Sequence, residues 1–567
     1  MLRRLPTVVV TAIAAALALA PAVAGQGPQA SEERLRIAIP GDDGSLTPYT
    51  FESGYAFMSL VYDTLTWRDP TGKPQPWLAR SIDRDATGRV VTVRLRPDVK
   101  WHDGRPLTAA DVAFTYRYMA ERPHARFTPQ LQDIETVEPI DRLSVRFTLR
   151  RRSLGLEDQP FADVPILPQH LWNDLPRSRR TPAGRPVGTG PYRLTSYRQG
   201  RSYRFDANAN YFRTVSVPRI DVPIIGREDT LADALLRRRI DAAPITIPPG
   251  TRLSRTSGLR IAEEVSYTGT MLLFNVRGRP FNRLAARRAV ARALDLDAIA
   301  DNETGAAGGV VAAHQGMVHP RSPWARTGRL HRFDPARARV AFAEQGIDAF
   351  RVAASSNDPV RLETGKRVVR ALRRAGARAR LVELSPDALD GVLGRRQAPA
   401  SFDVAVTGIP ALASYDPAFL AAIFGDLRVA SLNDGGYSSD RFDRLAARAA
   451  SARTIAERRA VVSQELQLLA RDLPAVPLHF GGGTIVYRAA AYDRWVAIRG
   501  TGILDKRSFL RGQAATSSGG ARAGGPGNVT DLTDVTDDQG FSLVPIIVGF
   551  VAVMLAGMAW WLRRGRR

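Results

Sequence analysis

Cysteine is absent from the 567 residues of this chain. Its absence excludes disulfide bonds, thiolate metal ligands and cysteine nucleophiles. Signatures of other enzyme classes are missing too, since no G-x-S-x-G or H-E-x-x-H segment occurs. The adjacent acids Asp42 and Asp43 fit a turn at a strand end better than a general acid and base. We therefore expect a protein that is not an enzyme and carries no cofactor.

Histidine is scarce, and its seven positions lack the spacing of a metal site. His314 and His319 stand five residues apart in a glycine-containing loop that runs into Pro320. An ordinary loop is the better interpretation of this pair, and a metal pair is the open alternative. We expect no metal site.

Acidic residues are outnumbered, and the formal net charge is +24. A nucleic-acid-binding chain would gather its basic residues in a stripe interleaved with aromatic residues. Here the arginines are scattered through every segment and often fall on helix faces, as do Arg367, Arg370, Arg373 and Arg374. We expect no nucleic-acid partner and an arginine-rich solvated surface that tolerates anionic lipid head groups.

The two ends of the chain read as targeting segments. Residues 1–24 combine Arg3-Arg4, an apolar run and an A-x-A site, which predicts a cleaved secretory signal; an uncleaved anchor is the alternative. Residues 541–562 carry no charge and would span about 33 Å as a helix. Trp560 and Trp561 stand at the end of this run, and the basic tail 563–567 follows it. The ends predict a single-pass protein of the cell membrane, with its bulk extracytoplasmic and its C-terminus cytoplasmic.

Residues 512–540 are rich in glycine and aspartate and contain the pair Ser517-Ser518. This composition predicts a flexible linker, whose 29 residues would span about 30 Å r.m.s..

The stretch from Leu78 to Met119 organises the first part of the chain. It opens with a turn at residues 85–88 and continues as a strand in which Val91, Val93 and Leu95 share one face. After the turn His102-Asp103-Gly104, Thr108 and Asp111 form the pattern of a helix capping box. The turn is expected to join strand to helix and to have no catalytic role.

These residues resemble a known family signature. The family 5 extracytoplasmic solute-binding proteins, which include the oligopeptide-, dipeptide- and nickel-binding proteins of ABC importers, carry LR-x-x-V-x-(F/W)-H-D-G followed by (P/T)-L-T-A-x-D-V. Here Leu95-Arg96, Val99, Trp101 to Gly104, Leu107 to Ala109 and Asp111-Val112 stand in that order. Many relatives are tethered through a lipid-modified cysteine, which this chain lacks.

Further segments resemble motifs of the same family, and they follow in the family's order: Tyr62 to Leu65, Pro186 to Tyr192, Asn208 to Phe212, Leu231 to Asp241, Ala286 to Asp295 and Gly436 to Leu445. The glycines 188 and 190 invite a phosphate-loop interpretation. A strand follows them and no G-K-(S/T) is present, so that role is not expected. The resemblance extends over roughly residues 34 to 500.

Residues 350–407 have a βαβ pattern. Strands are predicted at 350–354, 380–384 and 402–407, with helices at 362–375 and 386–393 between them. Parallel strands joined in this way form an open sheet, and such sheets bind ligands beyond their carboxyl ends.

The resemblance implies an α/β, periplasmic-binding-protein-like fold of type II in its large three-subdomain form. Two lobes joined by a hinge are expected, plus the C-terminal transmembrane helix. The expected division follows: 32–60, 181–268 and 480–511 for lobe I; 61–180 for a small second subdomain; 269–479 for lobe II, Rossmann-like and ligand-facing.

In the family the ligand lies between the large lobes. Mapped by motif, the resemblance implies these ligand-binding residues: Asp42, Asp43, Gly44, Tyr267, Thr270, Met271, Ser414, Tyr415 and Asp416. Tyr267 and Tyr415 could equally be core aromatics. Peptide-binding relatives place an aspartate four residues before the proline of the last loop, and the count from Pro417 gives Ala413. An apolar residue cannot neutralise a buried ammonium, which weakens a peptide assignment.

The expected function is that of a membrane-anchored substrate-binding protein of an ABC transporter. It would capture a peptide or related small solute and deliver it to permease subunits, acting as a monomer attached to the lipid bilayer through 541–562. A cell-surface solute sensor or scaffold on the same fold is the alternative. The five residues after the span are too few for a cytoplasmic domain, which disfavours that alternative.

Overall fold

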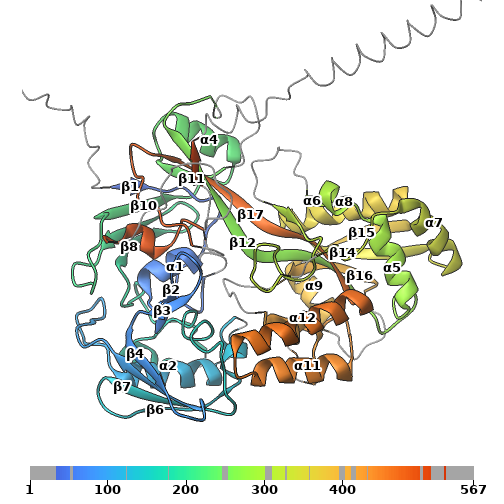
Figure 1. Ribbon diagram of the computed structural model, residues 1–567. Helices are drawn as coiled ribbons and strands as arrows, with labels where there is room; N and C mark the ends of the chain where they lie inside the picture. Colours follow the sequence, from blue (N-terminus) through green and yellow to red (C-terminus); the bar gives the residue numbers. More distant parts are fainter. Residues whose placement is uncertain are drawn as a thin grey trace, which may run out of the picture.

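The computed structural model describes most of the chain between Arg34 and Asp531 (Figure 1). The described residues are 34–51, 55–122, 124, 126–176, 178–245, 253, 255–300, 310–325, 328–356, 358–394, 402–409, 417–428, 430, 432–498, 502–512 and 529–531. The predicted signal peptide, most of the predicted linker, the predicted span at 541–562 and the basic tail lie outside them.

The membrane part of the fold prediction needs correction. No described helix is both long enough and apolar enough to cross a membrane. The longest of them, α12 (Ile455–Asp472), has 18 residues and carries charges in its first, middle and last turns. The transmembrane helix and the single-pass membrane location are therefore not supported.

The first lobe is built on two four-stranded sheets (Figure 1). One has the order β1-β10-β9-β8, with β1 parallel to β10. Its elements are β1 (Leu35–Arg36), β8 (Tyr192–Arg198), β9 (Ser202–Ala207), β10 (Arg219–Pro223), and the nearby helices α1 (Tyr55–Val61) and α4 (Glu228–Leu236).

The other sheet is an antiparallel meander with the order β4-β5-β7-β6. Val91, Val93 and Leu95 of β5 are at most 2% exposed, as their alternation predicts. This part comprises β2 (Thr66–Arg68), β3 (Pro74–Pro76), β4 (Ala79–Arg84), β5 (Val90–Leu95), β6 (Ile134–Pro139), β7 (Ser144–Leu149), α2 (Ala109–Glu121), α3 (Gln169–Trp172) and the 3-10 helix at Thr128–Leu131.

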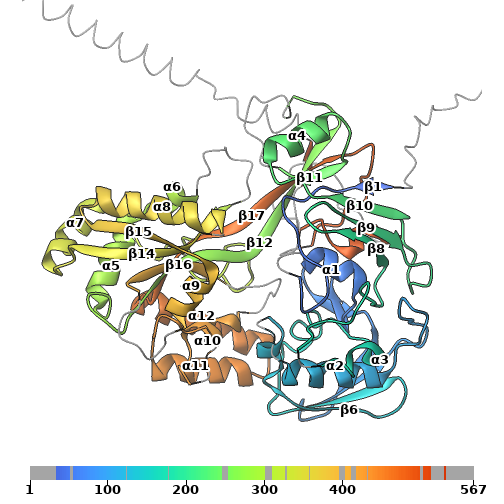
Figure 2. The same ribbon diagram turned by 180° about the vertical axis from the view of Figure 1, so that it is seen from behind.

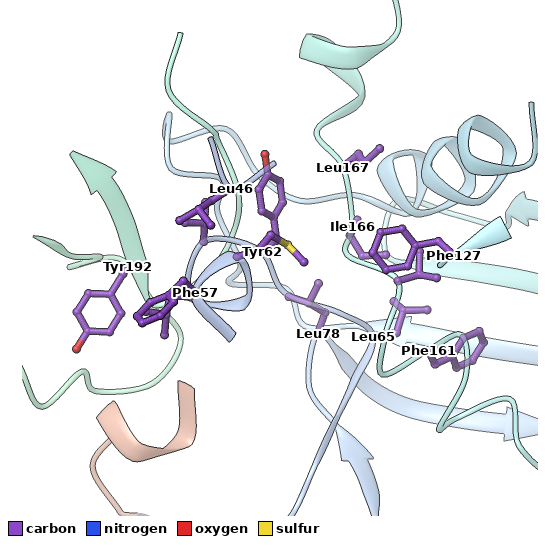
Figure 3. Packing of buried hydrophobic residues seen from close by; sticks show 14 of the residues in the cluster. Leu46, Phe57, Tyr62, Leu65, Leu78, Phe127, Phe161, Ile166, Leu167 and Tyr192 are labelled. Carbon is purple, nitrogen blue, oxygen red and sulfur yellow. The ribbon is translucent and has the colours of Figure 1, made fainter. Parts of the chain in front are cut away.

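The two sheets of the first lobe share one hydrophobic core. Figure 3 shows Phe57 and Tyr192 packed at the first sheet. Phe127 and Phe161 pack at the meander, and Leu65 and Leu78 lie between the two groups. A common core makes the two sheets one packing unit, because neither buries its apolar face alone.

The largest sheet has the path β11-β17-β12-β16-β14-β15; off this path, β13 pairs with β17 and β18 pairs with β12. β14, β15 and β16 are parallel, as the βαβ pattern predicts, whereas β12 and β17 are antiparallel. The strands are β11 (Ala242–Pro244), β12 (Leu259–Phe274), β13 (Val311–Ala312), β14 (Ala349–Ser355), β15 (Arg378–Leu384), β16 (Val404–Ile409), β17 (Ala475–Arg488) and β18 (Val529–Asp531).

Helices cover both faces of this sheet and form the second lobe with it. On β12, Leu272 and Phe274 belong to one core, and Met271 and Leu273 belong to the core of the opposite face. The first core takes α5 (Leu284–Ala293), α6 (Leu296–Ala300), α7 (Pro335–Glu344) and α8 (Pro359–Arg374); the second takes α9 (Pro386–Leu393), α10 (Phe419–Phe424), α11 (Asp440–Ser451) and α12.

Candidate ligand-binding region

Two long strands connect the lobes. The chain enters the second lobe through β12 and returns through β17, and both views show this pair running between the lobes (Figures 1 and 2). At the first lobe, β17 pairs with β11, and Ala242 of β11 bridges to Ile37. At the second lobe, β12 pairs with β16 over Gly269–Phe274. The pair therefore belongs to both lobes at once.

The pairing of β12 with β17 is interrupted part-way along. The register shifts between Val265 and Gly269, and again between Thr270 and Met271. A Cβ added at Gly269 would lie 2.8 Å from the carbonyl oxygen of His479, so only glycine allows this approach. Irregular pairing of this kind bends a strand and re-aims its side chains.

The predicted residues Tyr267, Thr270 and Met271 lie on this irregular part of β12, and each is 3–4% exposed. The ring of Tyr267 lies 5.4 Å from that of His319, which lies 5.2 Å from Phe480 of β17. Burial, aided by the nearby charge of Arg321, lowers the pKa of His319 to about 4, so this imidazole is neutral. Tyr267 of β12 and Phe480 of β17 thus form an aromatic group with His319, which lies in the loop after β13.

The second predicted group, Asp42 to Gly44, lies in the first lobe against the β8–β9 hairpin. The carboxylate of Asp42 accepts hydrogen bonds from the hydroxyls of Tyr197 and Tyr203 and from the backbone of Gly44 and Gly200. Burial alone would raise the pKa of Asp42, but these hydrogen bonds outweigh it and keep that pKa below its usual value. The charge of Asp42 is already stabilised inside its own lobe.

The third predicted group, Ser414 to Asp416, and the neighbouring Ala413 lie outside the described residues. The strand that precedes them, β16, ends at Ile409 beside β12. Near this end, the Arg361 guanidinium of α8 lies over Gly408, where an added Cβ would be 2.5 Å from its Nη2.

One polar pair in this region could not be found from motifs. Nε2 of His479 lies 3.0 Å from the hydroxyl of Thr364 on α8, and both side chains are 4% exposed. Burial, with Arg367 and Arg361 nearby, lowers the pKa of His479 to about 4. The two residues are 115 positions apart, so no sequence motif could have paired them. The alternation of residues along β17 could only have indicated that residue 479 is buried.

Comparison with known proteins decides the family. The model of the bacterial extracellular solute-binding proteins, family 5, matches residues 73–430. The chain belongs to this family.

Individual relatives are distant. The Di/tripeptide-binding protein 1 of Pseudomonas aeruginosa is 25% identical over 356 residues, which is 56% of this chain and 64% of that protein. Among solved structures, NikZ from Campylobacter jejuni in complex with Ni(L-His) is 24% identical with a TM-score of 0.68, covering 81% of this chain and 94% of that one. DppA from Helicobacter pylori in complex with the peptide STSA is 21% identical with a TM-score of 0.70, covering 84% and 97%.

These likenesses confirm the periplasmic-binding-protein-like α/β fold and the predicted family. Members of the family are solute-binding proteins, so at the level of the family the chain is a binding protein. Its match spans less than two thirds of the length of the Pseudomonas aeruginosa relative.

In this family 5 solute-binding protein, His102 links its own signature segment to the signature at residues 186–192. Nε2 of His102 lies 3.0 Å from the carbonyl oxygen of Gly190, and Nδ1 accepts from the backbone of Gly188 at 3.3 Å. A Cβ added at Gly188 or Gly190 would overlap the carbonyl oxygens of Val61 or Leu60 at the end of α1. The two signatures therefore meet and shape the first lobe, in agreement with a structural role for the His102 turn.

The two histidines considered as a metal pair have different partners. Nε2 of His314 lies 2.6 Å from Asp297, whereas His319 packs between Tyr267 and Phe480. Within the part of the chain that the structure describes, no group of three or more His, Cys, Asp or Glu side chains could hold a metal ion.

A surface hollow of about 400 Å³ lies on the first lobe rather than along the connecting strands. Its lining residues all come from the segment 105–174: Arg105, Pro106, Asp111, Gln169, His170, Asn173 and Asp174. Nε2 of His170 and the carboxylate of Asp103 are 2.6 Å apart nearby. Nothing predicted to contact ligand lies in this hollow.

Proposed function

We propose that this chain is the substrate-binding protein of an ABC importer, which holds a small solute between its lobes and presents it to membrane permease subunits. We further propose that it acts as a monomer, because one chain contains both lobes. The observation that carries the proposal is the β12–β17 pair, which joins the lobes by two strands of interrupted pairing. Such a connection can bend while each lobe stays rigid.

Tyr267, Thr270 and Met271 are the proposed contacts from the connecting strands. Tyr267, His319 and Phe480 form a group of uncharged rings that are at most 3% exposed. An uncharged aromatic environment of this kind would favour a ligand with apolar or planar parts. Asp42 to Gly44 would contact the ligand through backbone groups and define the shape of the site. The Asp42 carboxylate already accepts hydrogen bonds from its own lobe. Ser414, Tyr415 and Asp416 complete the proposed set.

The relatives suggest the class of solute. The names and titles of the similar proteins mention di- and tripeptides, the peptide STSA and Ni(L-His). All of these contain a carboxyl group and nitrogen atoms. Because the count back from Pro417 gives Ala413 at the position of the aspartate of peptide-binding relatives, we propose a small peptide or a metal–amino-acid chelate, whose amino nitrogen would be held by another group.

Thermal unfolding of the full chain against solute pools tests this function. The pools are dipeptides, tripeptides, and histidine with and without nickel(II). A ligand at one hundred times its Kd should stabilise the protein by about 2.7 kcal/mol. Tyr267→Ala should lose this response, while Ile455→Ala, at an exposed site on α12, should keep it. The proposal fails if no pool raises the Tm and no solute co-purifies with the protein by mass spectrometry.

A further inference from the structure

The two helical faces of the large sheet differ in charge. Helices α5 to α8 on one face hold eleven Arg and Lys and three acidic residues. Helices α9 to α12 on the opposite face hold six basic and seven acidic residues. We call α5, α7 and α8 the basic layer. The neutral opposite face shows that this charge is not a uniform property of the lobe.

Acidic side chains neutralise only part of the basic layer, since Arg337 pairs with Asp334 and Arg361 pairs with Asp358. On α8, Lys366, Arg367 and Arg370 all lie within 4 Å of one carboxylate, that of Glu363. The other basic side chains of the layer are mostly exposed, as is Arg332 just outside it. Arg378 is exposed too and pairs with Asp348. Exposed ion pairs are weak, so most of the positive electrostatic potential of the basic layer extends into the solvent.

An apolar ridge accompanies this charge on α7. Ala338 and Phe342 form the inner face of the helix. The outer face presents Ala336, Val340 and Ala343 at helical spacing, with Phe333 just before the helix. Phe333 is 47% exposed and Val340 is 58% exposed.

Arginines stand on both sides of the ridge. Arg337 and Arg339 neighbour Val340 along α7, and both are exposed. Nη2 of Arg339 donates to the carbonyl oxygen of Arg374 at 3.0 Å, which joins the ridge to the C-terminal end of α8. Exposure of large apolar side chains to water is unfavourable. An exposed apolar ridge flanked by cations is typical of a surface that binds where an anionic layer meets an apolar one.

We propose that the basic layer is a peripheral docking surface for anionic phospholipid head groups. The guanidinium groups of α7 and α8 would pair with lipid phosphates, and the ridge with Phe333 would enter the boundary below them. Charge spread over three helices suits an extended anionic surface better than a single small anion. The contact needs no spanning helix and does not depend on which solute the lobes bind.

The absence of cysteine allows a direct test with the full chain. Val340→Cys places an environment-sensitive nitrobenzoxadiazole label on the ridge, and Ile455→Cys places it on α12 of the neutral face, where the side chain is 46% exposed. Vesicles containing phosphatidylglycerol should raise the emission at 340 and leave that at 455 unchanged. Pure phosphatidylcholine vesicles should have little effect, and high salt should reverse the rise.

Charge variants give the second measurement. Replacing the exposed Arg332, Arg337 and Arg374 by glutamine should lower the partition onto phosphatidylglycerol vesicles roughly a hundredfold, since each basic residue near the surface contributes about fivefold. Replacing the exposed Arg441, Arg444 and Arg448 of α11 by glutamine is the matched control and should have a much smaller effect.

Three outcomes would overturn the proposal: no change at 340, an equal change at 455, or an equal loss of binding in both arginine variants. A response at 340 to polyglutamate but not to vesicles would also overturn it and would indicate an acidic protein partner.

Discussion

Lys506 and Asp63 form an ion pair with 2.7 Å between Nζ and Oδ1, and both side chains are fully buried. The residues are 443 positions apart, so the pair fastens the returning C-terminal segment to the end of α1. The ring of Trp67 lies 4.0 Å from the Lys506 ammonium, and Trp77 and Tyr211 donate to the Asp63 carboxylate. Burial lowers the pKa of Lys506, and the charge of Asp63 opposes this effect.

Lys506→Met should destabilise the protein by about 3–5 kcal/mol, because it leaves a buried carboxylate without its cation. Adding Asp63→Asn should recover part of the loss, since the unpaired charge is then gone. Arg237→Met breaks an exposed pair with Asp233 and should cost less than about 1 kcal/mol. Urea unfolding measures all three, and equal losses from Lys506→Met and Arg237→Met would contradict a tight buried pair.

His102 should make stability fall in mild acid. Burial lowers the pKa of His102 to about 4, against 6.5 when unfolded, so the unfolded chain binds a proton first. Neutral His102 makes its full contribution to the free energy of unfolding above pH 6.5. As the pH falls toward 4 this contribution is lost, and the loss is at most about 3 kcal/mol. Burial is the main cause of this low pKa, and Nδ1, which accepts from the Gly188 backbone, could not do so once protonated.

The measurement is the free energy of unfolding at several pH values for the natural chain and for His102→Gln. The variant should be less stable at pH 7.5 and should lose less stability than the natural chain between pH 6.5 and 4. Parallel pH curves would show that His102 does not titrate in this window.

Gly188→Ala should disrupt the junction of the two family signatures. The added methyl group would overlap the Val61 carbonyl oxygen, and backbone cannot move aside as a flexible side chain can. We expect a loss of about 3 kcal/mol or more. Gly391→Ala in α9, where no atom lies within 4 Å of the new Cβ, should leave stability unchanged or raise it slightly. Circular-dichroism melts compare the two, and a tolerated Gly188→Ala would contradict the close contact.

Asp42→Asn should affect stability more than solute binding. The change removes the charge that Tyr197, Tyr203 and two backbone N–H groups stabilise, with an expected loss of about 1–3 kcal/mol. Tyr203→Phe should act in the same direction, because its hydroxyl also accepts from the Asp43 backbone at 2.8 Å. If Asp42→Asn abolished the response to a solute at unchanged Tm, the carboxylate would be a direct ligand contact.

Local patterns predicted much of the fold. The alternation of residues 90–95 gave the buried face of β5, and Asp111 accepts from the Thr108 backbone at 2.9 Å as the capping pattern implies. The βαβ pattern predicted the parallel β14 and β15. These features depend on neighbours in sequence, where period and capping residues are informative.

Long-range relationships were not predictable in the same way. The expected division at 268/269 falls inside β12, because the polar residues before Gly269 hide a strand that begins at Leu259. The partners of Asp42 lie about 155 to 161 residues away on the β8–β9 hairpin. The contact of His479 with Thr364 needs the bulged register of β17. Each of these depends on tertiary packing, and the ligand-binding set stays a prediction.

The distance between the lobes tests the central claim most directly. Spin labels at Ile140→Cys in the first lobe and Ile455→Cys in the second, both 46% exposed in the natural chain, report that distance in the full chain by pulsed electron paramagnetic resonance. A pool of dipeptides, tripeptides or nickel(II)–histidine that raises the Tm should shift the distance distribution to a shorter, narrower one. A distribution that stays the same with every such pool would contradict a solute held by closure about β12 and β17.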